Sequence, residues 1–150
     1  MSYKGKYSIK NPSKYVGNSS SIIFRSLWEK KFMEVCDMTP SILKWASEEV
    51  VIPYFFPVDK KWHRYFPDFY IMYKTRTNTI EESIIEIKPY KELFRPERKT
   101  KKTKRFLQEN ITWVKNQSKW KSAKQYCHKK GWKFQILTEK ELFKKWHTER

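Results

Sequence analysis

A chain of 150 residues with 17% aromatic residues is long enough for one compact domain with its own hydrophobic core, which excludes a disordered basic tail. Its 33 Lys and Arg outnumber 16 Asp and Glu, and the formal net charge of +17 favours a nucleic acid partner. A basic surface without such a partner, or an acidic protein partner, is the alternative. The two distant cysteines form no zinc motif, and no run of about 18 apolar residues predicts a membrane span.

The amino-terminal part of the chain predicts an arm followed by a helix. Residues 1–20 are rich in Lys, Ser, Tyr and Asn and predict a flexible basic arm, whereas residues 21–150 predict a single domain. Apolar residues at helical spacing predict a helix over residues 21–37, with the serines at 19–21 as capping candidates. Glu29 lies at the border of its apolar face, where a carboxylate could reach a cleft between the helix and a sheet.

Three strands are predicted next, over residues 48–56, 64–73 and 82–88. Turn-forming residues separate them, and their spacing favours an antiparallel meander. Pro53 indicates that the first of them is an edge strand or carries a bulge, because proline cannot donate a hydrogen bond to a neighbouring strand.

The carboxy-terminal part predicts a helix, a strand and a short helix. The helix covers residues 111–130 and ends at Gly131, and the strand covers residues 132–137. Thr138 and Glu141 have the spacing of a capping box that opens the last helix. The order of helix, three strands, helix, strand and helix predicts an α/β fold, with helices packed on a mixed β-sheet.

Acidic residues and a lysine on two neighbouring strands could form a metal site. Glu86 and Lys88 project to the same side of their strand because alternate side chains share a face. Asp68, on the preceding strand, would lie within reach as a hairpin neighbour, and Glu29 could join from the packed helix. Hard divalent cations prefer such oxygen ligands, and a bound cation activates water for phosphodiester cleavage.

Each of these residues alone has a commoner explanation. A Pro-Asp pair is commonly a turn, and an acid and a lysine two positions apart usually form a solvated strand face. Glu29 alone would usually be an exposed helix acid paired with Arg25. The specificity comes from their combination in one strongly basic chain. His63 is a further candidate for proton transfer, although a turn histidine is the commoner role, and no nucleophile signature is present.

The strongest local charge block covers residues 88–105, which hold nine Lys or Arg and only two acids. It directly follows Lys88, so its side chains could contact DNA phosphates near the site. A solvated lysine-rich helix is the alternative. The predicted contacts to double-stranded DNA are Lys91, Arg95, Arg98, Lys99, Lys101, Lys102, Lys104 and Arg105.

The Pro67–Asp68 pair followed by Glu86–Lys88 resembles the motif of the PD-(D/E)XK nucleases, which have a restriction-endonuclease-like fold. The resemblance implies a deoxyribonuclease that requires Mg²⁺, with Mn²⁺ as an alternative ion, and that cuts as an endonuclease, with exonuclease action left open. It implies Asp68, Glu86 and Glu29 as metal ligands and Lys88 as the residue that positions or activates water. The Trp132–Leu142 segment is similar to the closing strand and helix of TnsA-type endonucleases.

Over its full length the chain resembles the head completion nucleases of T-even-type tailed phages. That resemblance implies action on packaged DNA ends before the tail joins the head, with phage head or connector proteins as further partners. It places the protein in the cytoplasm of the infected bacterial host, with retention in the virion as an option. Two alternatives stay open: a DNA-end-binding connector protein on a nuclease fold, and a junction-resolving endonuclease, since the Phe24–Glu29 segment is similar to one.

Overall fold

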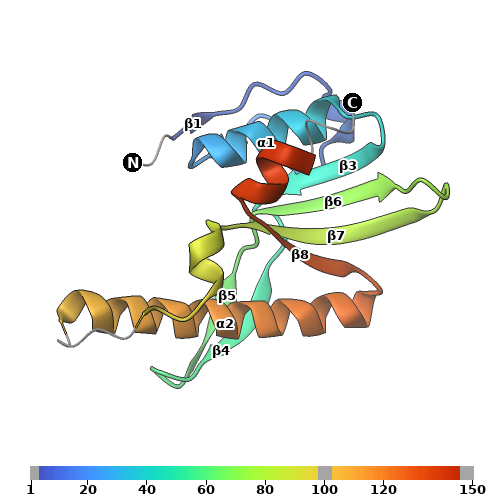
Figure 1. Ribbon diagram of the computed structural model, residues 1–150. Coiled ribbons are helices and arrows are strands. Elements are labelled where there is room, and N and C mark those ends of the chain that lie inside the picture. The colour runs from blue at the N-terminus through green and yellow to red at the C-terminus, as the bar shows by residue number, and fades with distance from the viewer. Residues whose placement is uncertain (1–3, 98–102, 146–150) are drawn as a thin grey trace.

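The computed structural model describes residues 4–97 and 103–145 (Figure 1). The strands are β1 (Gly5–Lys6), β2 (Ile23–Phe24), β3 (Ile42–Ser47), β4 (Ile52–Phe56), β5 (Lys61–Tyr65), β6 (Phe69–Lys74), β7 (Ile80–Ile87) and β8 (Lys133–Leu137). The α-helices are α1 (Leu27–Met38) and α2 (Lys104–Lys130). Three short turns of helix complete the fold: η1 (Pro12–Lys14), η2 (Tyr90–Leu93) and η3 (Glu141–Lys145).

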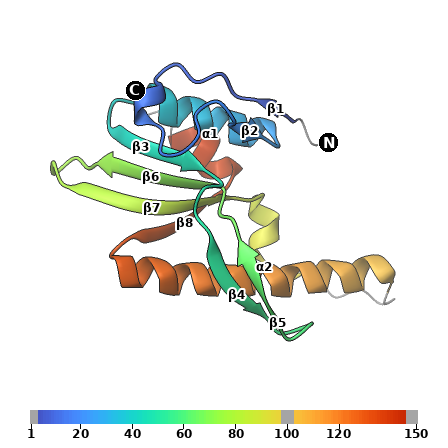
Figure 2. The same cartoon turned by 180° about the vertical axis from the view of Figure 1, so that it is seen from behind.

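A four-stranded mixed sheet forms the centre of the fold, in the order β3-β6-β7-β8. The strands β3, β6 and β7 are antiparallel neighbours, whereas β8 runs parallel to β7 and is reached through α2. Helix α1 covers one face of this sheet and α2 lies on the other side, as both views show (Figures 1 and 2). This arrangement confirms the prediction of a mixed α/β sheet with helices packed on it.

The strands β4 and β5 form a separate antiparallel ribbon that packs against α2. Ile52, Tyr54 and Phe56 alternate inward along β4 and form a second core cluster with Tyr65 and with Trp120 of α2. The first cluster lies between α1 and the main sheet. The chain returns from the ribbon to the main sheet just before β6 begins, so β5 ends shortly before the predicted Asp68.

The segment before α1 is packed, which corrects the prediction of a flexible arm for residues 4–20. Tyr7 and Tyr15 are buried, and both rings meet Trp45 edge-on. Val16 N–H donates to the Trp45 carbonyl at 2.8 Å, so the segment lies along the outer edge of β3. The segment is ordered because burial of its aromatic side chains outweighs the conformational entropy lost when this polar stretch is fixed.

Buried Asp37 ties this segment to α1. Its Oδ2 accepts from the Tyr7 hydroxyl at 2.7 Å and from Lys10 N–H at 2.8 Å, and its Oδ1 accepts from Asn11 N–H at 2.9 Å. Burial alone would raise the pKa of Asp37, but these hydrogen bonds stabilise the charged form and lower the pKa below its usual range. The carboxylate therefore acts as a charged anchor for residues 7–11.

The first helix begins at Leu27, six residues later than the predicted start at 21. Its cap is Ser26, whose Oγ accepts from Glu29 N–H at 3.1 Å, and residues 23–24 form β2 instead. Ser26 and Glu29 have the spacing of a capping box, a signal that the serines at 19–21 obscured in the sequence.

The three-stranded meander over residues 48–56, 64–73 and 82–88 is wrong in its pairing. The chain forms β3 over residues 42–47, which the sequence reading missed, and then switches to the ribbon and back. Residues 64–73 therefore belong to two strands, and Pro67 lies between them. Pro53 is on the edge of the ribbon, as predicted, because β4 pairs only with β5.

The carboxy-terminal predictions are confirmed with one shift in a boundary. Helix α2 begins at Lys104 rather than 111 and ends at Gly131, whose φ of 74° is the left-handed conformation that favours glycine. The strand predicted over residues 132–137 is β8. Thr138 N–H donates to Glu141 Oε1 at 2.7 Å, which is the reciprocal bond of a capping box.

Cys36 and Cys127 are both buried and unpaired. Across residues 4–97 and 103–145, no helix combines the length and apolar character needed to cross a bilayer.

Replacing Asp37 by Ala should destabilise the protein by about 3 kcal/mol, because it leaves one buried and two partly buried donors without their charged acceptor. For a chain of this size, we expect a fall in Tm of roughly 10 °C in a thermal melt. Glu34→Ala, on the exposed side of the same helix, is the matched control. Since folding lowers the pKa of Asp37, its stabilisation should be present above about pH 4 and disappear as the pH falls through the lower, folded-state pKa. Equal melting of both variants would contradict the anchoring role.

Candidate active site

The predicted acids meet where β7 ends beside the start of β6. Asp68 immediately precedes β6, and its Oδ2 accepts from Ile87 N–H at 2.8 Å. Glu86 directly precedes Ile87, at the buried end of the central strand β7. The structure therefore brings Asp68 and Glu86 together across the β6–β7 pair.

A hydrogen bond and an ionic contact hold the Glu86 side chain inside the protein. It is 6% exposed, and its Oε1 accepts from the Tyr65 hydroxyl at 2.6 Å. Lys88 Nζ lies 4.0 Å from its Oε2. The same carboxylate therefore meets the ribbon through Tyr65 and the following lysine through its second oxygen.

Both acids have raised pKa values. Burial raises the pKa of Asp68 well above its usual range, and the adjacent Glu86 charge adds to the rise, although the bond from Ile87 N–H opposes it. Burial also raises the pKa of Glu86, while the Tyr65 hydroxyl and the Lys88 charge oppose the rise. Two carboxylates so placed favour either a shared proton or a bound cation.

Glu29 lies nearby but is oriented by its own helix end. Its Oε1 accepts from Arg25 N–H at 3.1 Å, and burial raises its pKa, with a further contribution from the charge of Glu86. The Arg25 guanidinium pairs with Glu48 instead, at 3.2 Å. Glu29 thus adds negative charge to the site. Its hydrogen bond with Arg25 comes from the Arg25 backbone N–H and not from the guanidinium.

A second lysine enters the site from α2, and the sequence reading missed it. Lys119 is half-buried, and burial lowers its pKa, while attraction to Glu86 opposes that shift. Its Nζ lies 5.4 Å from the centre of the Tyr65 ring. Tyr65 was missed as well, since nothing in the local sequence marks one tyrosine among nine or one lysine among many.

The carboxylate oxygens of the site suit a hard cation, but only two of the acids lie together. Among the residues that the structure describes, no three His, Cys, Asp or Glu side chains are arranged to hold a metal. The closest arrangement is the carboxylate pair of Asp68 and Glu86, with Glu29 outside it.

The predicted DNA contacts divide into two groups. Lys91, Arg95, Lys104 and Arg105 are exposed on η2, the segment after it, and the start of α2. Arg98, Lys99, Lys101 and Lys102 lie outside the described residues. His63 contacts Asp59, with its Nε2 at 2.7 Å from Oδ2, and stacks on Tyr54 in the ribbon, an arrangement that explains it without catalysis.

Comparison with known proteins shows the family to which the chain belongs. The family model described as the TnsA-like endonuclease N-terminal domain matches residues 39–139, which contain Asp68, Glu86, Lys88 and Lys119. The chain therefore belongs to the TnsA-like endonuclease family, whose domain has a restriction-endonuclease-like fold. It is also 44% identical, over 143 residues, to the head completion nuclease of Enterobacteria phage T4, and the match covers 93% of each chain. No solved structure matches it significantly.

Replacing Tyr65 by Phe should shift the acid limb of the cleavage pH profile upward by about one unit. Loss of the hydroxyl removes a hydrogen bond to charged Glu86, and such bonds contribute roughly 1.5–3 kcal/mol. The measurement is the rate of DNA cleavage against pH. Tyr54→Phe is the control, because Tyr54 is buried in the same ribbon without a bond to Glu86. A lower rate with an unmoved profile would assign Tyr65 a packing role only.

Proposed function

We propose that this nuclease hydrolyses DNA phosphodiester bonds with the help of a divalent cation, as a PD-(D/E)XK enzyme. The observation that carries the proposal is the pair of adjoining carboxylates, Asp68 and Glu86, with raised pKa values and two lysines beside them. Structural ion pairs usually match opposite charges one to one. Here two acids are forced together in a buried position, an arrangement that is typical of a catalytic centre.

The residues fit Mg²⁺, with Mn²⁺ as an alternative ion. Asp68 and Glu86 would hold it, since both supply oxygen ligands and both carry a charge that burial disfavours. Glu29 would act as an accessory ligand, because its raised pKa reflects the same acidic field. A cation bound there supplies Lewis acidity toward the phosphoryl oxygen and lowers the pKa of water.

The protein's own groups then orient and balance the charges. Ile87 N–H and the Tyr65 hydroxyl each fix one oxygen of the two acids, so the carboxylates keep their orientation as substrate enters. Lys88, close to Glu86, positions the attacking water and offsets charge that develops on the phosphoryl oxygens. Lys119 supplies a second positive charge from α2, and its lowered pKa allows it to accept or release a proton more readily than a solvated lysine.

Double-stranded DNA is the proposed substrate, held by the basic surface that begins at η2. Helix α2 carries eight Lys or Arg and a single acid, Glu109. Lys91, Arg95, Lys104 and Arg105 extend this surface from the site toward the start of the helix. Contacts of this kind bind phosphates without reading bases, so the affinity should fall steeply with salt.

The related T4 protein is named a head completion nuclease, and we propose the same role here. The enzyme would act on packaged phage DNA ends before the head and tail join, in the cytoplasm of the infected bacterium, with head or connector proteins as partners. A DNA-end-binding connector protein is the alternative, and a junction-resolving endonuclease is a second. The complete acid pair favours an enzyme over a binding protein.

The direct test is incubation of the purified protein with supercoiled plasmid and linear duplex, in Mg²⁺ or in EDTA. We expect cleavage only with the metal, and a loss of at least a thousandfold in Asp68→Asn, because an amide cannot supply the ligand charge. Asp59→Asn, in the ribbon turn, should cleave normally. The product pattern separates nicking from end resection. A folded wild-type protein that binds DNA but cuts neither substrate would favour the connector reading.

The same acids should make the empty site destabilising. A carboxyl whose pKa is raised by folding disfavours the folded state above its unfolded pKa of about 4, so stability falls as the pH rises from there to the folded pKa. At pH 7 in EDTA, Asp68→Asn should therefore melt several degrees above the wild type. Mg²⁺ should raise the Tm of the wild type but not that of the variant. An unchanged wild-type Tm at millimolar Mg²⁺ would argue against a metal site at these residues.

A further inference from the structure

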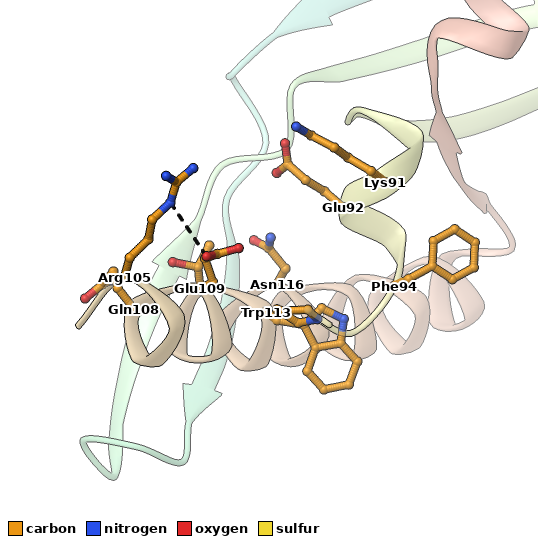
Figure 3. A pocket seen from close by; sticks show the side chains of 10 residues that line it. Lys91, Glu92, Phe94, Arg105, Gln108, Glu109, Trp113 and Asn116 are labelled. Carbon is orange, nitrogen blue, oxygen red and sulfur yellow. Dashed lines mark ion pairs between the residues drawn. The ribbon is translucent and has the colours of Figure 1, made fainter. Parts of the chain in front are cut away.

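A cavity of about 490 Å³ lies between η2 and α2, next to the site but outside it (Figure 3). Its volume falls in the range of about 300–1,000 Å³ that is usual for small-molecule pockets. Figure 3 shows Glu92, from η2, and Asn116, from α2, pointing into the space between the two elements. None of its lining residues takes part in the catalytic arrangement, so the cavity needs its own explanation.

Two short separations along the chain place this cavity beside Lys88 and Lys119 of the proposed active site. Lys91, in its wall, follows Lys88 by three residues, so their Cα atoms are at most about 11 Å apart. Asn116 precedes Lys119 on α2 by three residues, a rise of about 4.5 Å along the axis. A DNA strand whose phosphate lay at Lys88 and Lys119 would bring a neighbouring nucleotide to the mouth of the cavity.

The lining matches a nucleobase rather than a phosphate alone. Phe94 and Trp113 supply aromatic rings, and the Arg95 guanidinium lies 5.0 Å from the centre of the Trp113 ring. Glu92 and Glu109 are acceptors for exocyclic amino groups, whereas Lys91 and Arg105 are cations suited to the flanking phosphates. The combination of rings, acceptors and cations at the rim is the one that a single nucleotide requires.

Asn116 is the independent sign of a ligand. It is 5% exposed and lines the cavity, yet its side-chain amide makes no hydrogen bond to any residue that the structure describes. The amide points into the cavity, so its donor and acceptor are available to a ligand. Trp113 Nε1, from another residue of the same lining, is a buried donor with no hydrogen-bond partner among the described residues. The edge of a base presents the matching donor and acceptor.

We propose that this cavity receives one unpaired nucleobase, so that the enzyme prefers DNA with frayed or single-stranded ends to an intact duplex. A paired base keeps its hydrogen-bonding edge inside the duplex and cannot enter such a pocket without being extruded. The proposal names the substrate class of the proposed nuclease and rests on that function. Binding measured without cleavage tests it separately.

The experiment compares fluorescein-labelled blunt duplex with the same duplex carrying mismatched bases at one end, by fluorescence polarisation in EDTA. We expect the wild type to bind the splayed end about tenfold more tightly. Asn116→Leu, close in size but without the amide, and Trp113→Ala should each reduce this preference to less than about twofold while blunt-duplex affinity stays unchanged. Gln125→Leu, an exposed amide on the same helix, should retain it.

Equal affinity of the wild type for both ends would overturn the proposal, as would a preference that survives in both pocket variants. A parallel loss of blunt-duplex affinity would also overturn it, since the pocket would then serve phosphate binding in general. Thermal melting checks that each variant is folded, and either pocket variant alone is sufficient if the other is not. Plasmid cleavage in Mg²⁺ is measured independently. Loss of the nuclease hypothesis would appear as absent cleavage, whereas loss of the pocket hypothesis would appear as an absent binding preference.

Discussion

The repulsion between Asp68 and Glu86 is the constraint around which the rest of the site is organised. The sheet forces them together, because Glu86 is the last residue but one of the buried central strand and Ile87 N–H holds Asp68 beside it. Three neighbouring groups reduce the cost of that closeness: the Tyr65 hydroxyl, the Lys88 ammonium and the Lys119 ammonium. These groups come from the ribbon, the end of β7 and α2. The three-layer arrangement is therefore what allows an acidic pair to exist inside a protein of this size.

Such a centre explains why the net charge of +17 is useful rather than merely tolerated. Two acids in an apolar setting would repel a polyanionic strand. The exposed cations of α2 and of the segment after η2 place positive charge outside the site, whereas the acids of the pair lie inside it. Positive charge on the surface attracts DNA phosphates over a long range. Exposed positive charge and the acid pair are thus supplied by different elements, and eight of the 33 Lys and Arg lie on α2 alone.

The sequence predicted which side chains lie together better than it predicted the path of the chain. Asp68, Glu86 and Lys88 could be found because alternation on a strand and hairpin adjacency are local rules. Strand β3 and the ribbon could not, because the switch between sheets depends on where Tyr54 and Phe56 find α2, a helix some fifty residues later. Lys119 was invisible for the same reason: only the crossover of α2 beneath β7 distinguishes it from the other lysines of that helix. Tyr7 and Tyr15 show the converse error, since a polar composition concealed two aromatic anchors.

The packing of the amino-terminal segment along β3 also affects how copies of this protein can meet. An outer strand with free backbone groups is a template on which another molecule can add a strand. Here Val16 N–H occupies the Trp45 carbonyl, midway along that edge, and Tyr15 bridges to the same residue. A second molecule cannot extend the sheet through β3 without first displacing residues 15–16. Two copies that paired through the central sheet would therefore have to use its other edge strand, β8, because residues 15–16 close the sheet to strand addition at β3.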